Sequence, residues 1–260
     1  MPDPEELQCR VHGDASLPTL VYLPGIHADW TLMGGVRKAL AGKVRVVEFT
    51  YPRTLAWSLE DYAGAVLAAL RENRITEGWL LGESFSSQVV WVLLRAPSHF
   101  ETQGIILAGG FARYPVMPAV SFLHATWSVL PSLQLRLILL LYRASAWFRY
   151  RNSPETMMGA REFAARRTLP DWQAIGQRLQ LIRDHDPREQ VRQLKLPLYV
   201  LSGLIDPIVP WPLTFRWFRK NCPALRETKL IRNADHNVLG TAPAESAREI
   251  LRWMGQQDTR

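Results

Sequence analysis

A serine between small residues follows an apolar run in the first third of the chain. Ser84 lies in Gly82–Ser86 (Gly-Glu-Ser-Phe-Ser), directly after the apolar run 79–81. A buried strand that stops at such a serine is typical of a nucleophile elbow, a tight strand-to-helix turn that holds one side chain in a strained position. The flanking residues are small because backbone approaches backbone on both sides of the turn. A serine that caps a helix after a strand is the alternative interpretation.

A serine hydroxyl becomes a strong nucleophile when a histidine takes its proton and an acid orients that histidine. Two later segments supply these groups. Asp206 falls in the loop after residues 198–203, which are typical of a buried strand, and His236 follows residues 229–232, which are interpreted as the next strand. The order along the chain is therefore Ser84, Asp206, His236, with each residue placed after a separate predicted strand.

This order and the surrounding segments resemble the α/β-hydrolase fold superfamily over nearly the whole chain. Residues 203–210 (Gly-Leu-Ile-Asp-Pro-Ile-Val-Pro) resemble the segment that carries the acid. Asp235–Asn237, followed by a helical pattern at 242–254, resembles the histidine loop and the terminal helix. The resemblance implies an α/β fold with a mostly parallel, doubly wound sheet. It also implies that the serine, acid and histidine named above form a catalytic triad.

A further match lies at 19–27 (Thr-Leu-Val-Tyr-Leu-Pro-Gly-Ile-His). In the resembled superfamily the corresponding strand ends in His-Gly, and the next residue donates its backbone N–H to the oxyanion hole. By position that residue is Ile26, and the second donor is the N–H of Phe85. Pro24 stands where the family often has histidine, which leaves the glycine turn intact.

His27 belongs to the same loop, at the mouth of the expected site, and is a candidate substrate-binding residue. The alternative is that it packs in the loop near Asp29 and Trp30. Asp235 adjoins His236, but neighbouring side chains in a loop rarely face each other productively, so Asp206 is the better candidate for the acid. The remaining histidines do not follow a strand in the required order: His12, His99, His124 and His185.

Strand-like and helix-like segments alternate along the chain, which favours a parallel sheet covered by helices on both faces. Further strands are expected at 44–50 and 104–108, and helices at 59–73, 87–94, 211–221 and 244–254. No internal repeat or Gly/Ser-rich linker divides the chain.

Residues 112–186 are too many for a simple loop between two strands. In the resembled superfamily a helical cap is inserted here, after the strand that follows the nucleophile helix. We therefore expect a core domain of residues 1–111 and 187–260 and a helical cap or lid of residues 112–186. Helices are expected at 119–127, 133–148, 156–167 and 171–184.

Residues 133–142 form the most apolar stretch, yet the stretch is too short to span a bilayer and contains Arg136. The favoured interpretation is a buried helix packed on the core. It could also roof an apolar pocket for an acyl chain. Shallow contact with a membrane surface, aided by Arg143, Arg149 and Arg151, is the less favoured interpretation.

Composition is that of one globular domain: 260 residues, 47% hydrophobic and 21% charged. The two cysteines, Cys9 and Cys222, show no metal-binding spacing and suit a reduced, cytoplasmic setting. The acidic start, Met1–Glu6, does not look like a secretory signal. The formal net charge of +7 comes without a nucleic-acid motif, so no nucleic-acid partner is expected.

The sequence thus predicts a serine hydrolase that cleaves a carboxylic ester with an apolar acyl part through an acyl-enzyme. No metal or organic cofactor is expected, and the oligomeric state stays open. The same residues would serve a thioesterase, an acyltransferase, a peptidase or a hydrolase of carbon–carbon bonds. A non-catalytic member of the fold that only binds a ligand or protein is a further alternative.

Overall fold

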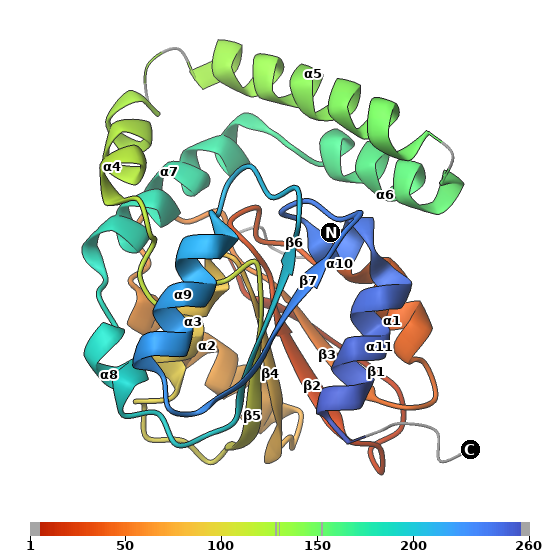
Figure 1. Cartoon of the computed structure of the whole chain (residues 1–260), viewed down its shortest axis with the longest axis vertical. Helices are drawn as coiled ribbons and strands as arrows, with labels where there is room; N and C mark the ends of the chain where they lie inside the picture. Colours follow the sequence, from red (N-terminus) through yellow and green to blue (C-terminus); the bar gives the residue numbers. More distant parts are fainter. Residues whose placement is uncertain (1–5, 128, 130, 152, 256–260) are drawn as a thin grey trace.

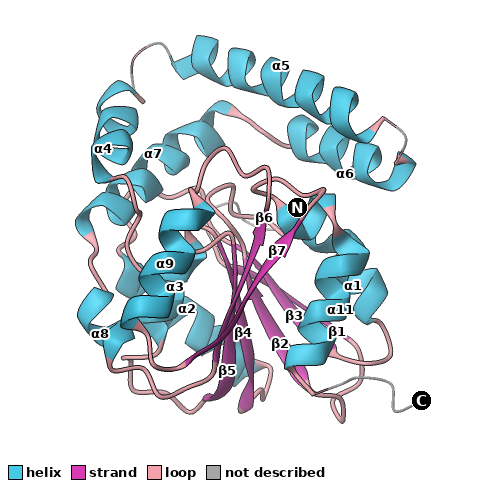
Figure 2. Ribbon diagram, in the orientation of Figure 1, coloured by secondary structure: helices cyan, strands magenta, loops and turns pink. Residues whose placement is uncertain are grey.

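The computed structural model describes residues 6–127, 129, 131–151 and 153–255. Residues 1–5, which make up most of the segment considered as a signal, lie outside this range. Within it, seven strands form one sheet in the order β1-β3-β2-β4-β5-β6-β7 (Figures 1 and 2). All neighbouring pairs are parallel except β1 with β3. The strands are β1 (Gln8–His12), β2 (Thr19–Leu23), β3 (Arg45–Thr50), β4 (Glu77–Glu83), β5 (Glu101–Ala108), β6 (Leu198–Gly203) and β7 (Leu225–Ile231).

Helices cover both faces of this sheet, as the alternation of segments predicted (Figure 2). One face carries α2 (Leu59–Glu72), α3 (Ser86–Leu93), the short α8 (Arg188–Arg192) and α9 (Trp211–Asn221). The other carries the 3-10 turn η1 (Thr31–Met33), α1 (Gly34–Leu40), α10 (Val238–Thr241) and α11 (Pro243–Trp253). The architecture is a mostly parallel, doubly wound α/β sheet.

Local sequence accounts for the way these elements form. The side chain of Ser58 accepts a hydrogen bond from the backbone N–H of Asp61, and the Asp61 carboxylate accepts one from the N–H of Ser58, which starts α2 with a capping box. Its buried face holds Tyr62, Val66 and Leu70 at helical spacing. Strand β4 is buried over most of its length, as expected for a central parallel strand.

Four helices lie together beyond the end of the sheet, above the points where β4 and β6 stop (Figure 1). They are α4 (Met117–Thr126), α5 (Pro131–Tyr150), α6 (Pro154–Ala165) and α7 (Leu169–Asp184). The helices expected from the sequence between 119 and 184 correspond to these four. Helix α5 packs on α6 and α7 and forms the outermost layer in this view.

The expectation that the apolar helix is buried was wrong. In α5 only Ala146 is buried, whereas Leu140 is 64% exposed and Phe148 is 73% exposed. The hydrophobicity of α5 extends around most of the helix, and a pattern of this kind does not reveal that one side lacks a neighbour. No helix in the described ranges is long and apolar enough to cross a membrane.

Candidate active site

Ser84 stands in a strained turn between β4 and α3. Its φ angle is +47°, a left-handed conformation that is uncommon for residues other than glycine. The backbone N–H of Ser84 is held by the carbonyl of Ala108, at 2.9 Å, where β5 ends. A Cβ atom at Gly82 would lie 2.9 Å from Cγ2 of Val90, so the close packing of α3 on β4 requires glycine there. The turn expected from the Gly82–Ser86 pattern is present.

The side chains of Ser84, His236 and Asp206 form a continuous hydrogen-bonded chain. The Oγ of Ser84 lies 2.8 Å from Nε2 of His236, and Nδ1 of His236 lies 2.8 Å from Oδ2 of Asp206. An ionised carboxylate can only accept, so Nδ1 carries the proton and Nε2 is free to accept the serine proton. The arrangement can therefore convert Ser84 into a nucleophile.

Backbone groups fix the acid and make room for the histidine. The other carboxylate oxygen of Asp206 accepts the N–H groups of Ile208 and Val209, at 2.8 and 2.9 Å. Gly109, just after β5, has a φ of +60°, and a Cβ there would lie 3.2 Å from the imidazole of His236. Glycine at this position lets the ring approach Ser84.

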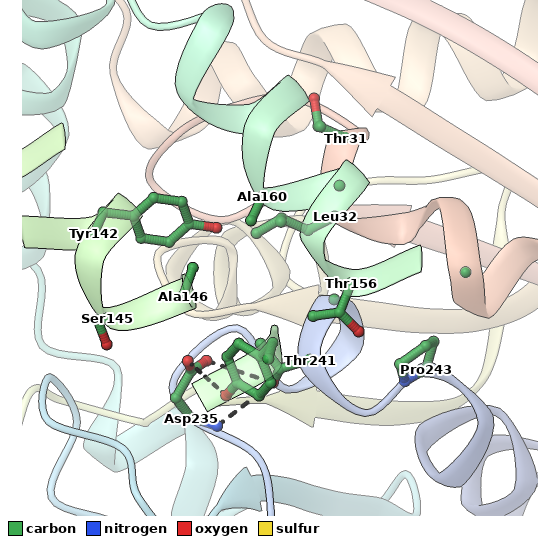
Figure 3. Close-up of a pocket in the computed structure, with 14 residues that line it drawn as sticks. Thr31, Leu32, Tyr142, Ser145, Ala146, Thr156, Ala160, Asp235, Thr241 and Pro243 are labelled. Atoms are coloured by element: carbon green, nitrogen blue, oxygen red, sulfur yellow. Dashed lines mark hydrogen bonds between the residues drawn. The ribbon is translucent and has the colours of Figure 1, made fainter. Parts of the chain in front are cut away.

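Asp235, the rival acid, faces away from this chain. Its carboxylate accepts the hydroxyl of Tyr150 at 2.9 Å and an N–H of Arg149 at 3.3 Å, both from the end of α5. Asp235 lines a small cavity of about 70 Å³. Figure 3 shows Thr241 close to Asp235 at this cavity, and the hydroxyl of Thr241 donates a hydrogen bond to the Asp235 carboxylate. Asp235 thus ties α5 to the histidine loop.

The electrostatic surroundings favour the protonated form of His236. Burial lowers the pKa of this imidazole, but the hydrogen bond that it donates to Asp206 and the negative charges of Asp206, Glu83 and Asp235 outweigh burial. The pKa of His236 ends above its ordinary value. A base with a raised pKa is well suited to hold the proton that a serine would give up.

The loop after β2 is held by an unusually complete set of hydrogen bonds. Five successive backbone carbonyls, from Pro24 to Ala28, each accept one. The donors, in chain order, are the hydroxyl of Ser86, the N–H of Ala28, the guanidinium of Arg178, the guanidinium of Arg167 and the N–H of Tyr51. Because these five carbonyls all accept hydrogen bonds, the backbone of the loop is held in one conformation, and its N–H groups therefore point in fixed directions.

Two buried arginines from the helical layer take part in this bracing. Arg178 on α7 donates to the carbonyls of Ile26 (3.0 Å) and Pro52 (2.8 Å) and to the hydroxyl of Tyr62 (3.2 Å). No ion pair of Arg178 occurs among the described residues, although it is only 1% exposed. Arg167, just after α6, donates to the carbonyl of His27 at 2.7 Å and pairs with Asp29. Sequence reasoning missed both arginines, because their partners lie more than a hundred residues away.

Glu83 and Ser86 brace the same loop from inside the elbow. The carboxylate of Glu83 accepts the hydroxyl of Tyr22 (2.5 Å) and the backbone N–H of Gly25 (3.2 Å). The hydroxyl of Ser86 donates to the carbonyl of Pro24 (2.5 Å) and lies 2.7 Å from the hydroxyl of Tyr51. Ser86 therefore links the elbow to the loop after β2.

The two backbone donors predicted for an oxyanion hole come from the elbow and from this loop. In the described part of the chain, neither the N–H of Ile26 nor that of Phe85 donates a hydrogen bond to a protein group. Phe85 directly precedes α3, so its N–H belongs to the positive end of that helix.

His27 lines the cavity beside Ser84 and is buried. Its Nε2 has no hydrogen-bond partner in the described ranges and lies 3.8 Å from Oε2 of Glu83. The ring also contacts Phe163 edge-on, with the centroids 5.2 Å apart. Burial lowers the pKa of His27, which keeps the ring neutral near pH 7.

A largely apolar cavity of about 390 Å³ opens in front of Ser84 and His236. Its size falls within the range of pockets that bind small molecules. The helical layer supplies most of the apolar wall: Val120, Leu123, Trp127, Leu135, Ile138, Leu139, Phe163, Trp172, Ile175, Leu179 and Ile182. Nowhere in the described ranges do three or more His, Cys, Asp or Glu side chains form a group that could hold a metal ion.

Comparisons with known proteins agree with this architecture. No protein-family model matches the chain, and no curated protein matches it by sequence. A hydrolase from Pseudomonas aeruginosa PA01 is similar in structure, with a TM-score of 0.78, 18% identity, and 96% of this chain and 94% of that chain covered.

Two further solved structures are similar over nearly their whole length. A thermophilic esterase from Thermogutta terrifontis gives a TM-score of 0.75 at 20% identity, covering 96% of this chain and 93% of that one. The enol-lactonase from Burkholderia xenovorans LB400 gives 0.74 at 17% identity, covering 96% of each chain. Together with the sheet order and the strained turn at Ser84, these similarities establish that the chain has the α/β-hydrolase fold.

Proposed function

We propose that this protein is a serine hydrolase that cleaves carboxylic esters with an apolar acyl group. The observation that carries the proposal is the hydrogen-bonded chain Ser84–His236–Asp206 at the base of an apolar cavity. Esterases and an enol-lactonase are among the solved structures with the same fold, which supports a hydrolytic reaction for this site.

The reaction would proceed in two halves. The Oγ of Ser84 attacks the ester carbonyl while Nε2 of His236 takes its proton, and Asp206 stabilises the imidazolium. The tetrahedral intermediate collapses when His236 passes the proton to the leaving alcohol, which leaves an acyl group on Ser84. Water then attacks the acyl-enzyme with His236 as base, and the acid is released.

The N–H groups of Ile26 and Phe85 would bind the oxyanion in both halves. Their lack of protein acceptors among the described residues and the bracing of the loop support this role. Preorganised donors of this kind cost no rearrangement during the reaction, and one of them typically contributes about 10²–10³ in rate.

The helical insertion, residues 112–186, would act as the cap of the site. Its helices supply most of the apolar wall, whereas polar groups gather near Ser84. An acyl chain would lie against this wall, and His27, with its unpartnered Nε2, would contact the substrate near the reacting carbonyl.

The test is hydrolysis of a series of p-nitrophenyl esters from acetate to palmitate by the wild type and by Ser84→Ala. We expect a loss of about 10⁴–10⁶ in kcat for the variant, by analogy with other triads, and an optimum at a chain longer than acetate. Equal rates for the two proteins would refute the proposal. If the wild type hydrolyses only thioester or amide substrates in a parallel panel, the bond type is wrong while the triad stands. Activity with none of them would favour a binding protein.

A further inference from the structure

Helix α5 has two different faces. Its inner side contributes Leu135, Ile138, Leu139 and Tyr142 to the cavity in front of Ser84. Its outer side is also apolar and has no neighbour within the described residues. Figure 1 shows why: α5 lies outside α6 and α7, at the end of the molecule farthest from the sheet.

The exposed apolar residues of α5 form a continuous stripe. They recur at the spacing that places side chains on one face of a helix: Leu133, Leu137, Leu140, Leu141, Ala144 and Phe148. Leu133 is 60% exposed, Leu141 is 59% exposed, and Trp147 beside the stripe is 56% exposed. Phe122 of α4 is 71% exposed and adds to the apolar surface of the same helical layer. Monomeric proteins rarely leave so many large apolar side chains together in water without a partner.

The charges beside the stripe point to the partner. Arg136 and Arg143 are exposed. At 3.6 residues per turn both lie on the same flank of the stripe, about 40° and 60° around the helix from Leu140. Helix α5 contains no acidic residue, so its charge is entirely positive. A second copy that docked through this helix would bring two positively charged helices without acidic residues against each other, whereas an anionic partner would attract the arginines.

We propose that the outer face of α5 docks on the surface of an anionic lipid bilayer. The helix would lie in the plane of the interface, with Leu137, Leu140, Leu141 and Phe148 in the acyl boundary and Arg136 and Arg143 at the lipid phosphates. No spanning segment is required. The wall of the cavity would then face the membrane, separated from it by the thickness of one helix.

Co-sedimentation with vesicles tests this proposal. The purified full chain is mixed with vesicles of phosphatidylcholine and phosphatidylserine, about 7:3, or of phosphatidylcholine alone, in about 0.1 M NaCl. We expect wild type to pellet with the mixed vesicles and much less with phosphatidylcholine alone. Wild type that stays in the supernatant with both compositions would overturn the proposal.

Three variants separate the contributions. Leu140→Gln/Leu141→Gln/Phe148→Gln should weaken binding at least about a hundredfold, because three apolar side chains lose their burial in the bilayer. Arg136→Gln/Arg143→Gln should weaken binding to the mixed vesicles about ten- to thirty-fold. The control Arg216→Gln/Arg226→Gln removes the same net charge from exposed positions on α9 and β7 and should change binding less than about threefold.

Because the substituted side chains are exposed, all variants should keep the wild-type melting temperature and the wild-type rate on a short, soluble ester. Equal weakening by the two arginine pairs would overturn the docking geometry, since net charge alone would then explain binding. Sedimentation velocity provides the remaining check. A dimer that the triple-glutamine variant abolishes would show that a second copy covers α5, and this result would also overturn the proposal.

Discussion

Arg178 donates a hydrogen bond to the backbone carbonyl of Ile26, 152 residues away in the chain, across a distance of 3.0 Å from Nη1 to O. The arginine belongs to the helical layer, and the carbonyl belongs to the loop proposed to bind the oxyanion. The position of the layer and the geometry of the loop are therefore coupled through one buried side chain.

Replacing Arg178 should weaken stabilisation of the transition state more than it weakens binding of the substrate. In Arg178→Gln the carbonyls of Ile26 and Pro52 lose their donors, and each buried acceptor left unpaired costs about 1–3 kcal/mol. We expect kcat to fall about 10- to 100-fold with a smaller change in KM, and the free energy of unfolding to fall as well. Ester kinetics and urea unfolding measure the two effects.

Arg183→Gln is the matched control, because this arginine lies on the same helix but, among the residues that the structure describes, bonds only to Asp184 and His124. It should leave kcat within about twofold, as expected for an exposed interaction. Affinity for a boronic acid, which mimics the tetrahedral intermediate, should fall in Arg178→Gln in step with kcat. An unchanged affinity would mean that Arg178 only stabilises the fold.

Asp206 and Asp235 should respond very differently to replacement by asparagine. Asp206→Asn removes the charge that orients and stabilises His236, and we expect a loss of about 10³–10⁴ in kcat. Asp235→Asn should change kcat less than about threefold and lower the melting temperature slightly, because Asp235 anchors Arg149 and Tyr150. A larger kinetic effect at Asp235 would reassign the acid.

The rate should depend on pH through His236. Only the neutral imidazole can take the serine proton, so kcat/KM should rise as pH increases through the pKa of His236. Since that pKa lies above its ordinary value of 6.5, the midpoint of the rise should also lie above 6.5. Asp206→Asn should shift the midpoint downward. Profiles of kcat/KM from about pH 5 to pH 9 measure this midpoint. A midpoint below 6.5 would contradict the electrostatic argument.

Ser86 and Tyr51 should contribute to stability as a pair. Ser86→Ala removes the donor to Pro24 and the partner of the Tyr51 hydroxyl, and should cost about 1–3 kcal/mol in the free energy of unfolding. Tyr51→Phe should cost about 1 kcal/mol. The double variant should lose less than the sum, because the two hydroxyls share one hydrogen bond. Urea unfolding of the four proteins measures the coupling, and strict additivity would contradict it.

Adjacent leucines of α5 offer a test of the cavity wall. Leu139 lines the cavity, whereas Leu140 points outward and is 64% exposed. Leu139→Trp should shorten the preferred acyl chain, with a loss of roughly fourfold in kcat/KM for each methylene excluded from the wall. Leu140→Trp should leave the chain-length profile unchanged. Shifts of equal size in both variants would place the acyl group elsewhere.

The fold and the position of the candidate triad could be predicted because both depend on local patterns. The strained turn needs Gly82 beside it, and Asp206 and His236 each follow a strand in a recognisable order. Strand β1 was missed, since Gln8–His12 is short, holds a single β-branched residue and lies at the edge of the sheet.

Other features depend on contacts that no local pattern encodes. Arg167 and Arg178 look like ordinary helix arginines in the sequence, and only the fold brings their guanidinium groups to the loop after β2. The outward face of α5 was misjudged for the same reason: burial is a property of neighbours, and the neighbours of Leu140 and Phe148 were unknown.

Hydrogen bonds anchor the helical layer to the core in two places, and their positions bear on how substrate would enter and product would leave. Arg167 and Arg178 pin α6 and α7 to the loop after β2, and Asp235 pins the last turn of α5. Lifting the layer as one body would break all of these hydrogen bonds together. The first turns of α5 carry none of these hydrogen bonds. We therefore expect the layer to tilt open at that end of α5 rather than to rise as one body, with substrate and product passing there.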